Sequence, residues 1–217
     1  MSMLAHLVTK LRREGVLTTF RAAVHWVLRR LRREGRSEFD QVTGLQTDGL
    51  VSSWQVRLVS PEATPGSRYQ PTPAELARRM IASLPIAYSD FHFVDLGCGK
   101  GRVLFIAEEF GFRSVAGVEY GEELAEVARR NVAQAGKQDR IEVRWQDAST
   151  YEIPDRTVVF MYNPFGAAVM SAVAAAIGRA RDVHVVYFEP KEECARLLDG
   201  VAKRIRTEGE CLFFRRA

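Results

Sequence analysis

Long apolar runs and cysteines are both scarce in this sequence. No stretch approaches the roughly 20 apolar residues that a membrane-spanning helix needs, and the N-terminus lacks the features of a signal peptide. The three cysteines, Cys98, Cys194 and Cys211, lie far apart and show no spacing typical of a zinc site. We therefore expect a cytoplasmic protein in a reducing compartment, with no transmembrane segment and no metal.

The charge is unevenly distributed along the chain. Residues 1–36 contain nine basic and two acidic residues, a net charge of +7, whereas the remainder carries −3 and the whole chain +4. Apolar residues recur at helical spacing in this segment, which predicts two basic amphipathic helices. A helical arm packed on the core or on a second subunit explains such faces, and nucleic acid or an anionic membrane surface stays open as an alternative.

The rest of the chain is typical of one folded domain. Hydrophobic residues make up 47% of the 217 residues and charged residues 27%. We expect an N-terminal basic helical arm and linker over residues 1–71 and a core domain over residues 72–217. The core is expected to begin with a helix, because Thr72 is a typical N-cap, Pro73 a first-turn proline and Glu75 a carboxylate that can reach back to the cap. A short strand or hairpin is expected around Trp54 to Val59 within the linker.

Strand-like and helix-like segments alternate from Phe91 onward, which predicts a doubly wound, mostly parallel sheet. The expected strands are residues 91–95, 114–119, 140–145, 157–162 and 182–188, and the expected helices are residues 101–110, 121–135, 166–179 and 190–199. Two further strand-like runs, residues 203–207 and 211–215, flank a short turn and predict a C-terminal antiparallel hairpin. The fold class is therefore α/β, with seven strands in the sheet.

The first strand of this core ends in a carboxylate and runs directly into a glycine loop. Asp95 is followed by Gly97, Gly99 and Gly101, so the backbone can turn sharply and approach a ligand closely. A dinucleotide site has the spacing GxGxxG and binds a pyrophosphate, which the negative charge of Asp95 disfavours. The loop therefore favours a cationic ligand over a nucleotide-dependent oxidoreductase.

The segment VDLGCGKGRV, residues 94–103, resembles motif I of the class I S-adenosylmethionine (SAM)-dependent methyltransferases. SAM carries two positively charged groups, an ammonium and a sulfonium, which match the cationic ligand that Asp95 favours. The resemblance covers about residues 90–217. Within the family, the chain is similar to small bacterial members whose substrate is unassigned. It implies SAM as the cofactor and no metal.

Several residues beyond the loop take cofactor-binding roles under this resemblance. Glu119 ends the second strand, where a carboxylate accepts hydrogen bonds from ribose hydroxyls, and Tyr120 beside it is placed to pack on the adenine. Asp147 and Ala148 follow the third strand at the position that recognises adenine; a local loop turn is the alternative for Asp147. Tyr69 is expected in a lid over the cofactor, or as a loop-packing residue.

The fourth strand runs into Asn163, Pro164 and Phe165, which resemble the (Asp/Asn)-Pro-Pro-(Phe/Tyr) motif of amino-group methyltransferases. In that motif the Asn oxygen and a proline-held carbonyl orient the acceptor nitrogen, and an aromatic face stabilises the developing charge. Phe165 stands where the second proline would be and Gly166 where the aromatic would be, so the match is partial. Asn163 is also counted among the cofactor-binding residues.

The expected reaction is an in-line displacement at the sulfonium methyl, with a nitrogen favoured over oxygen or carbon as the acceptor. A small molecule or a protein side chain is the expected substrate. An RNA methyltransferase using the basic arm, or a non-catalytic SAM-binding protein, is the competing interpretation. Nucleic acid is not favoured because no recognisable binding motif is present. A homodimer through the N-terminal helices stays open, and Glu189 is a weaker candidate for a general base.

Overall fold

The computed structural model describes residues 37–49 and 69–217. The two predicted basic helices and the strand or hairpin expected near Trp54 lie outside these residues. Among the described residues, no helix is long and apolar enough to cross a membrane.

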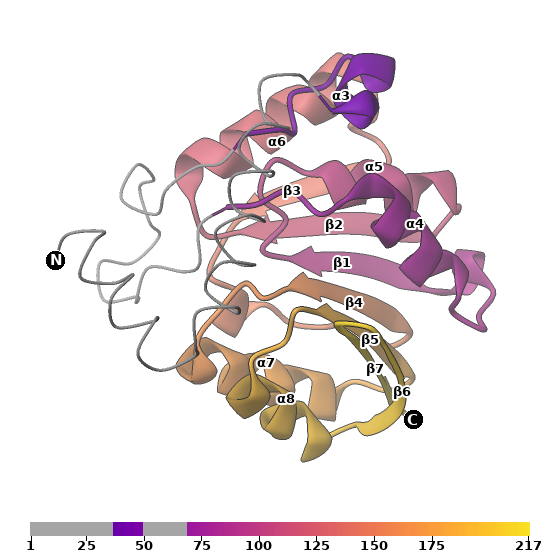
Figure 1. Ribbon diagram of the computed structural model, residues 1–217, viewed down its shortest axis with the longest axis vertical. Helices are drawn as coiled ribbons and strands as arrows, with labels where there is room; N and C mark the ends of the chain where they lie inside the picture. Colours follow the sequence, from indigo (N-terminus) through magenta and orange to yellow (C-terminus); the bar gives the residue numbers. More distant parts are fainter. Residues whose placement is uncertain (1–36, 50–68) are drawn as a thin grey trace, which may run out of the picture.

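The core is a seven-stranded sheet with helices on both faces (Figure 1). The strand order is β3-β2-β1-β4-β5-β7-β6, in which β7 is antiparallel to both β5 and β6 and the other neighbours are parallel. The strands are β1 (His92–Leu96), β2 (Ser114–Glu119), β3 (Ile141–Trp145), β4 (Thr157–Tyr162), β5 (Val183–Phe188), β6 (Lys203–Glu208) and β7 (Cys211–Arg216). The predicted α/β class, strand count and C-terminal hairpin are confirmed.

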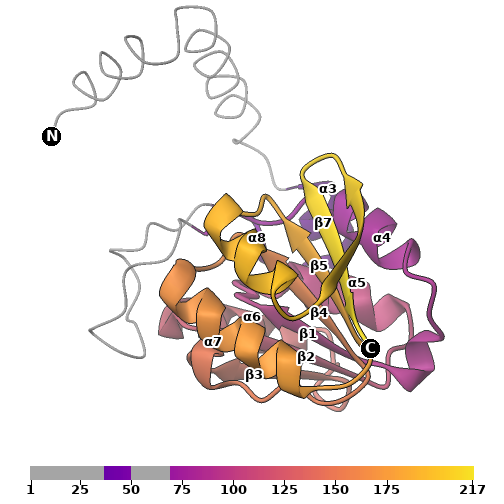
Figure 2. The same ribbon diagram turned by 90° about the horizontal axis from the view of Figure 1, so that it is seen from below.

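The described α-helices connect or flank these strands and cover them from two sides. They are α3 (Glu38–Thr43), α4 (Ala74–Ala82), α5 (Arg102–Glu109), α6 (Glu122–Gln134), α7 (Ala167–Arg179) and α8 (Glu192–Asp199), with short 3-10 turns at η2 (Tyr88–Asp90) and η3 (Ala148–Thr150). One apolar cluster joins α4, α5 and Val132 of α6 to one face of the sheet. A second joins α7 and α8 to the other face, where Figure 2 shows these two helices together.

The start of the first core helix differs from the sequence prediction. Helix α4 begins at Ala74 with Pro73 as its N-cap, and no side chain caps it. Thr72 is therefore not the N-cap; its carbonyl accepts a hydrogen bond from Arg102 instead. Glu75 pairs with Arg78, one turn further along the helix, rather than reaching back to the cap.

Residues 37–49, which the sequence analysis placed in the arm and linker, pack on the core. Phe39 and Leu45 are buried in the same apolar cluster as α4 and α5. Figure 1 shows α3 beside α6 at one end of the molecule. The boundary at residue 71 stays a prediction.

Candidate functional site

The candidate site lies at the carboxyl edge of the sheet, at the point where the strand order reverses. The chain proceeds from β1 outward to β2 and β3, and then returns to place β4 on the other side of β1. In open α/β sheets, ligands bind at such a switch point, beyond the carboxyl ends of the strands, so the loops after β1 and β4 are the expected place for a ligand. Gly97 to Gly101 form the first loop, after Asp95 near the end of β1, and Asn163 to Gly166 form the second.

Two glycines of the first loop are each approached by a ring. A Cβ added to Gly99 would lie 2.1 Å from Cε2 of Tyr69, and one added to Gly97 would lie 2.6 Å from Cβ of Pro164. Both glycines have positive φ, +55° and +88° respectively. The missing side chains thus admit both a left-handed backbone and close packing of Tyr69 and Pro164. Gly101 is the N-cap of α5, at the end of the same loop.

Asp95 is 4% exposed and lies at the end of β1, facing into the interior. Burial and the negative charge of Glu119 raise its pKa well above the usual range. Burial, together with the charges of Glu119 and Asp95, raises the pKa of the Cys98 thiol well above its usual range. Because two buried carboxylates are costly when close together, this part of the site favours a cationic ligand.

Glu119 is 8% exposed and holds two backbone segments together. One carboxylate oxygen accepts a hydrogen bond from the amide of Gly99 at 2.7 Å, and the other accepts one from Gly121 at 2.8 Å. Burial raises its pKa, while these amides oppose the rise. Each oxygen has two lone pairs, so the predicted ribose contacts remain chemically compatible with this arrangement.

The predicted adenine-binding residues lie after β2 and β3, which are neighbouring strands. The carbonyl of Tyr120 accepts a hydrogen bond from the indole of Trp145 at 3.1 Å, which ties the two strand ends together. The Asp147 carboxylate accepts one from the amide of Ser149 at 2.8 Å, so this side chain makes the local turn that was its alternative role. Ala148 is buried at the start of η3.

The predicted catalytic residues follow β4 directly. Asn163 has a positive φ of 38°, and its amide donates a hydrogen bond to the carbonyl of Phe188 at 3.1 Å. A non-glycine residue in this region stores strain that is typical of functional sites. Pro164 lies against Gly97, whereas the partly buried ring of Phe165 packs on the cluster formed by α7 and α8.

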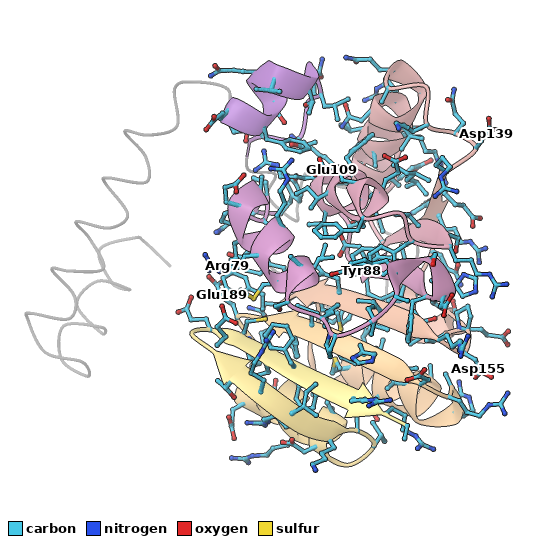
Figure 3. All side chains as sticks on the ribbon, turned by 90° about the vertical axis from the view of Figure 1, so that its right-hand side faces the viewer. Arg79, Tyr88, Glu109, Asp139, Asp155 and Glu189 are labelled. Carbon is cyan, nitrogen blue, oxygen red and sulfur yellow. The ribbon has the colours of Figure 1, made fainter. Side chains whose placement is uncertain are left out.

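A chain of polar side chains that the sequence analysis did not foresee lies beside Asn163. The amide of Gln70 donates to the hydroxyl of Tyr162 at 2.8 Å, and that hydroxyl donates to the carboxylate of Glu189 at 3.1 Å. Glu189 follows β5 with a positive φ of 46°. Figure 3 shows it at the opposite end of the sheet from Asp155. In the sequence, only the position of Glu189 at the end of a strand pointed to this group. No local pattern predicts the contact between Gln70 and Tyr162, which are 92 positions apart.

Comparisons with known proteins agree with this geometry. Residues 95–188 match the model of the ANTKMT methyltransferase domain. Over 95 residues the chain is 32% identical to a protein-lysine N-methyltransferase of Saccharolobus islandicus (strain REY15A). That match covers 43% of this chain, and the chain spans 58% of the length of the relative.

Solved structures share the fold. An RNA methyltransferase from Salinibacter ruber, in complex with S-adenosyl-L-homocysteine, superposes with a TM-score of 0.52 at 24% identity, covering 68% of this chain and 92% of that one. A predicted N6-adenine-specific DNA methylase from Listeria monocytogenes gives 0.57 at 15% identity, covering 68% and 51%. The chain is therefore similar to methyltransferases in sequence over residues 95–188, and it has the fold of SAM-dependent methyltransferases.

Proposed function

We propose that this chain is an N-methyltransferase that transfers the methyl group of SAM to the side-chain amine of a lysine in a protein. The observation that carries the proposal is the packing of Pro164 on Gly97, which brings the Asn163 loop directly onto the cofactor loop. The name of the Saccharolobus relative supports the choice of acceptor.

The residues of the first loop fit SAM. The buried carboxylate of Asp95 offers a counter-charge for the ammonium, and Glu119 has lone pairs left for the ribose hydroxyls. Asp147 and Ala148, with Tyr120 on the neighbouring strand, would hold the adenine. Tyr69 would close over the loop. When bound, SAM supplies an electrophilic methyl group on a positively charged sulfur.

The residues around Asn163 fit an amine acceptor. Asn163 lies in the loop that packs on the cofactor loop through Pro164, where its side-chain oxygen would accept a hydrogen bond from an amine and orient the lone pair. Glu189, hydrogen-bonded to Tyr162, places a carboxylate within the same loop cluster. That charge favours the approach of a cationic lysine, whose ordinary pKa of about 10.4 means that it arrives protonated.

The chain's own contribution is binding and alignment. The lysine ammonium loses a proton to water, its nitrogen forms a bond to the methyl carbon, and the carbon–sulfur bond breaks with its electron pair left on sulfur. The neutral thioether needs no acid, so positioning is the main source of acceleration and is worth roughly 7 to 11 kcal/mol in well-aligned reactions. Asn163 acts in this scheme as the residue that orients the amine.

The cofactor is tested first by isothermal titration calorimetry with SAM, S-adenosylhomocysteine and NADH. We expect micromolar SAM binding in the wild type and a loss of about 10-fold or more in Asp95→Asn, since a buried counter-charge is removed. The exposed Asp155, which pairs with Arg181, provides the matched control Asp155→Asn with unchanged affinity. Binding of NADH without SAM would sink the proposal.

The acceptor is tested with labelled SAM and lysine-containing peptides. Asn163→Ala should lower kcat by about 100-fold, with SAM affinity nearly unchanged, because an orienting contact is lost in the transition state. Labelling of RNA, or of hydroxyl-containing small molecules, with no labelling of lysine peptides would replace the amine by another acceptor. SAM binding without any transfer would indicate a binding protein.

A further inference from the structure

Lys100 of the glycine loop and Arg102, the first residue of α5, bind residues 37–48. Arg102 is 6% exposed, and its guanidinium binds the Asp48 carboxylate at 2.6 Å and the Ser37 hydroxyl at 3.0 Å. The Arg102 Nε atom donates to the Thr47 hydroxyl at 2.8 Å. The Lys100 ammonium donates to the carbonyl of Asp48. We call this set, Ser37, Asp40, Thr47 and Asp48 with Lys100 and Arg102, the clasp.

The clasp is closed internally by a second carboxylate. Asp40 is 1% exposed and accepts hydrogen bonds from the amides of Thr47 at 2.7 Å and Asp48 at 2.9 Å, and from the Thr47 hydroxyl. Arg102 also lies 3.6 Å from Asp40. A buried guanidinium that lies between two carboxylates and donates four hydrogen bonds forms a geometrically specific joint.

The clasp leads directly to Tyr69. The Tyr69 hydroxyl donates to the carbonyl of Thr47 at 2.7 Å, and the Lys100 ammonium lies 5.3 Å from the centre of its ring. The other edge of the same ring occupies the position of the missing Gly99 side chain. Tyr69 is therefore held at its hydroxyl by the clasp and presses with its ring on the cofactor loop.

We propose that Tyr69 is a positioning residue for the cofactor loop, and that the clasp sets its place over Gly99. Lys100 and Arg102 then serve the cofactor only indirectly, by fixing Thr47 and so the lid. The effect on SAM rests on the cofactor assignment under the proposed function. The effect on the loop itself does not, because the contacts are present in the protein without ligand.

The test is the variant Tyr69→Phe, which removes the hydroxyl and leaves the ring. Its control is Tyr88→Phe, because the Tyr88 hydroxyl likewise donates to a main-chain carbonyl, that of Ile81 at 3.1 Å, outside the clasp (Figure 3). Hydrogen–deuterium exchange of residues 97–101 is measured in the ligand-free proteins, and SAM affinity by calorimetry. Tyr69→Phe should accelerate loop exchange and weaken SAM binding, each by about 3- to 10-fold, as expected for one lost hydrogen bond. Tyr88→Phe should change neither.

A second variant, Asp48→Asn, tests the clasp at its ion pair and should also accelerate exchange of residues 97–101, while α8 exchanges as in the wild type. Wild-type exchange of the loop in both Tyr69→Phe and Asp48→Asn overturns the proposal, whatever the SAM result. Faster exchange in a protein whose wild type binds no SAM supports the positioning role and overturns the proposed function.

Discussion

At the scale of one residue, two features of the structure require glycine at position 99, the backbone conformation and the close packing of a ring. The backbone of Gly99 has a φ of +55°, and the ring of Tyr69 fills the space where a side chain would begin. Gly136 has a similar φ of +63° and nothing within 4 Å of an added Cβ. The two glycines therefore form a natural pair in which only the packing contact differs.

We predict that Gly136→Ala lowers the free energy of unfolding by about 1 to 2 kcal/mol, the cost of a left-handed alanine. Gly99→Ala should lose more than this and should also weaken SAM binding, because Tyr69 has to move. Urea unfolding and calorimetry measure the two effects. Equal stability losses in both variants would show that the ring contact carries no energy. Adding Tyr69→Ala should reduce the extra penalty, as expected for coupled neighbours.

Helix α6 acts, at the scale of an element, as a brace between the glycine loop and residues 37–49. The buried side chain of Asn131 accepts a hydrogen bond from the amide of Gln46 at 3.1 Å and donates to the carbonyls of Lys100 at 3.0 Å and Gln46 at 3.3 Å. Gln134, on the exposed part of the same helix, donates to the carbonyl of Gly44 at 2.9 Å. Helix α6 thus binds main-chain carbonyls of residues 37–49 through one buried side chain and one exposed side chain.

Asn131→Ala should destabilise the protein by about 2 to 3 kcal/mol, since it leaves buried backbone groups without partners. Gln134→Ala should stay within about 0.5 kcal/mol of the wild type, because water replaces the lost amide. Chemical denaturation of the two variants compares them directly. A loss in Asn131→Ala no larger than that in Gln134→Ala would argue against α6 as a brace.

At the scale of the whole molecule, the proposed function predicts that cofactor binding and proton binding are coupled through Asp95. Its pKa is raised by burial and by Glu119, so the free protein holds a proton there to a higher pH than an ordinary aspartate does. A cationic ligand binds the ionised form, so binding releases this proton as long as the pH lies below the raised pKa. The stabilisation that SAM provides should therefore grow as the pH rises through that pKa and shrink as it falls.

We predict that a hundredfold excess of SAM over its Kd stabilises the wild type by about 2.7 kcal/mol near neutral pH. The shift in melting temperature should decrease on acidification. In Asp95→Asn the shift at a fixed SAM concentration should be smaller and flat across the pH range where Asp95 titrates. Thermal melts with and without SAM measure this. A wild-type shift that does not change with pH would remove Asp95 as the ammonium partner.

Much of the core could be predicted from the sequence because its signals are local. The apolar runs of β1, β4 and β5 and the helical spacing between them appear within windows of a few residues. The glycine spacing after Asp95 is equally local, and so is the sequence Asn-Pro-Phe after β4. The predicted start of α4 was wrong by one residue, because Pro73 and not Thr72 is the N-cap. The carbonyl of Thr72 binds Arg102 of α5, and a helix-start pattern does not record a neighbour from another element.

The order and type of the core elements, the acidic end of β1, the glycine loop and the Asn-Pro-Phe loop were determined by the sequence alone, since periodicity and turn chemistry act between near neighbours. The partners of the charged and aromatic side chains were decided only by the tertiary structure. Arg102 meets Asp48 across 54 positions, and Gln70 meets Tyr162 across 92. Such pairings depend on how the strand order and the helices on the two faces of the sheet bring distant segments together. From the sequence alone, Lys100 and Arg102 beside a glycine loop could equally be interpreted as ligands for an anion.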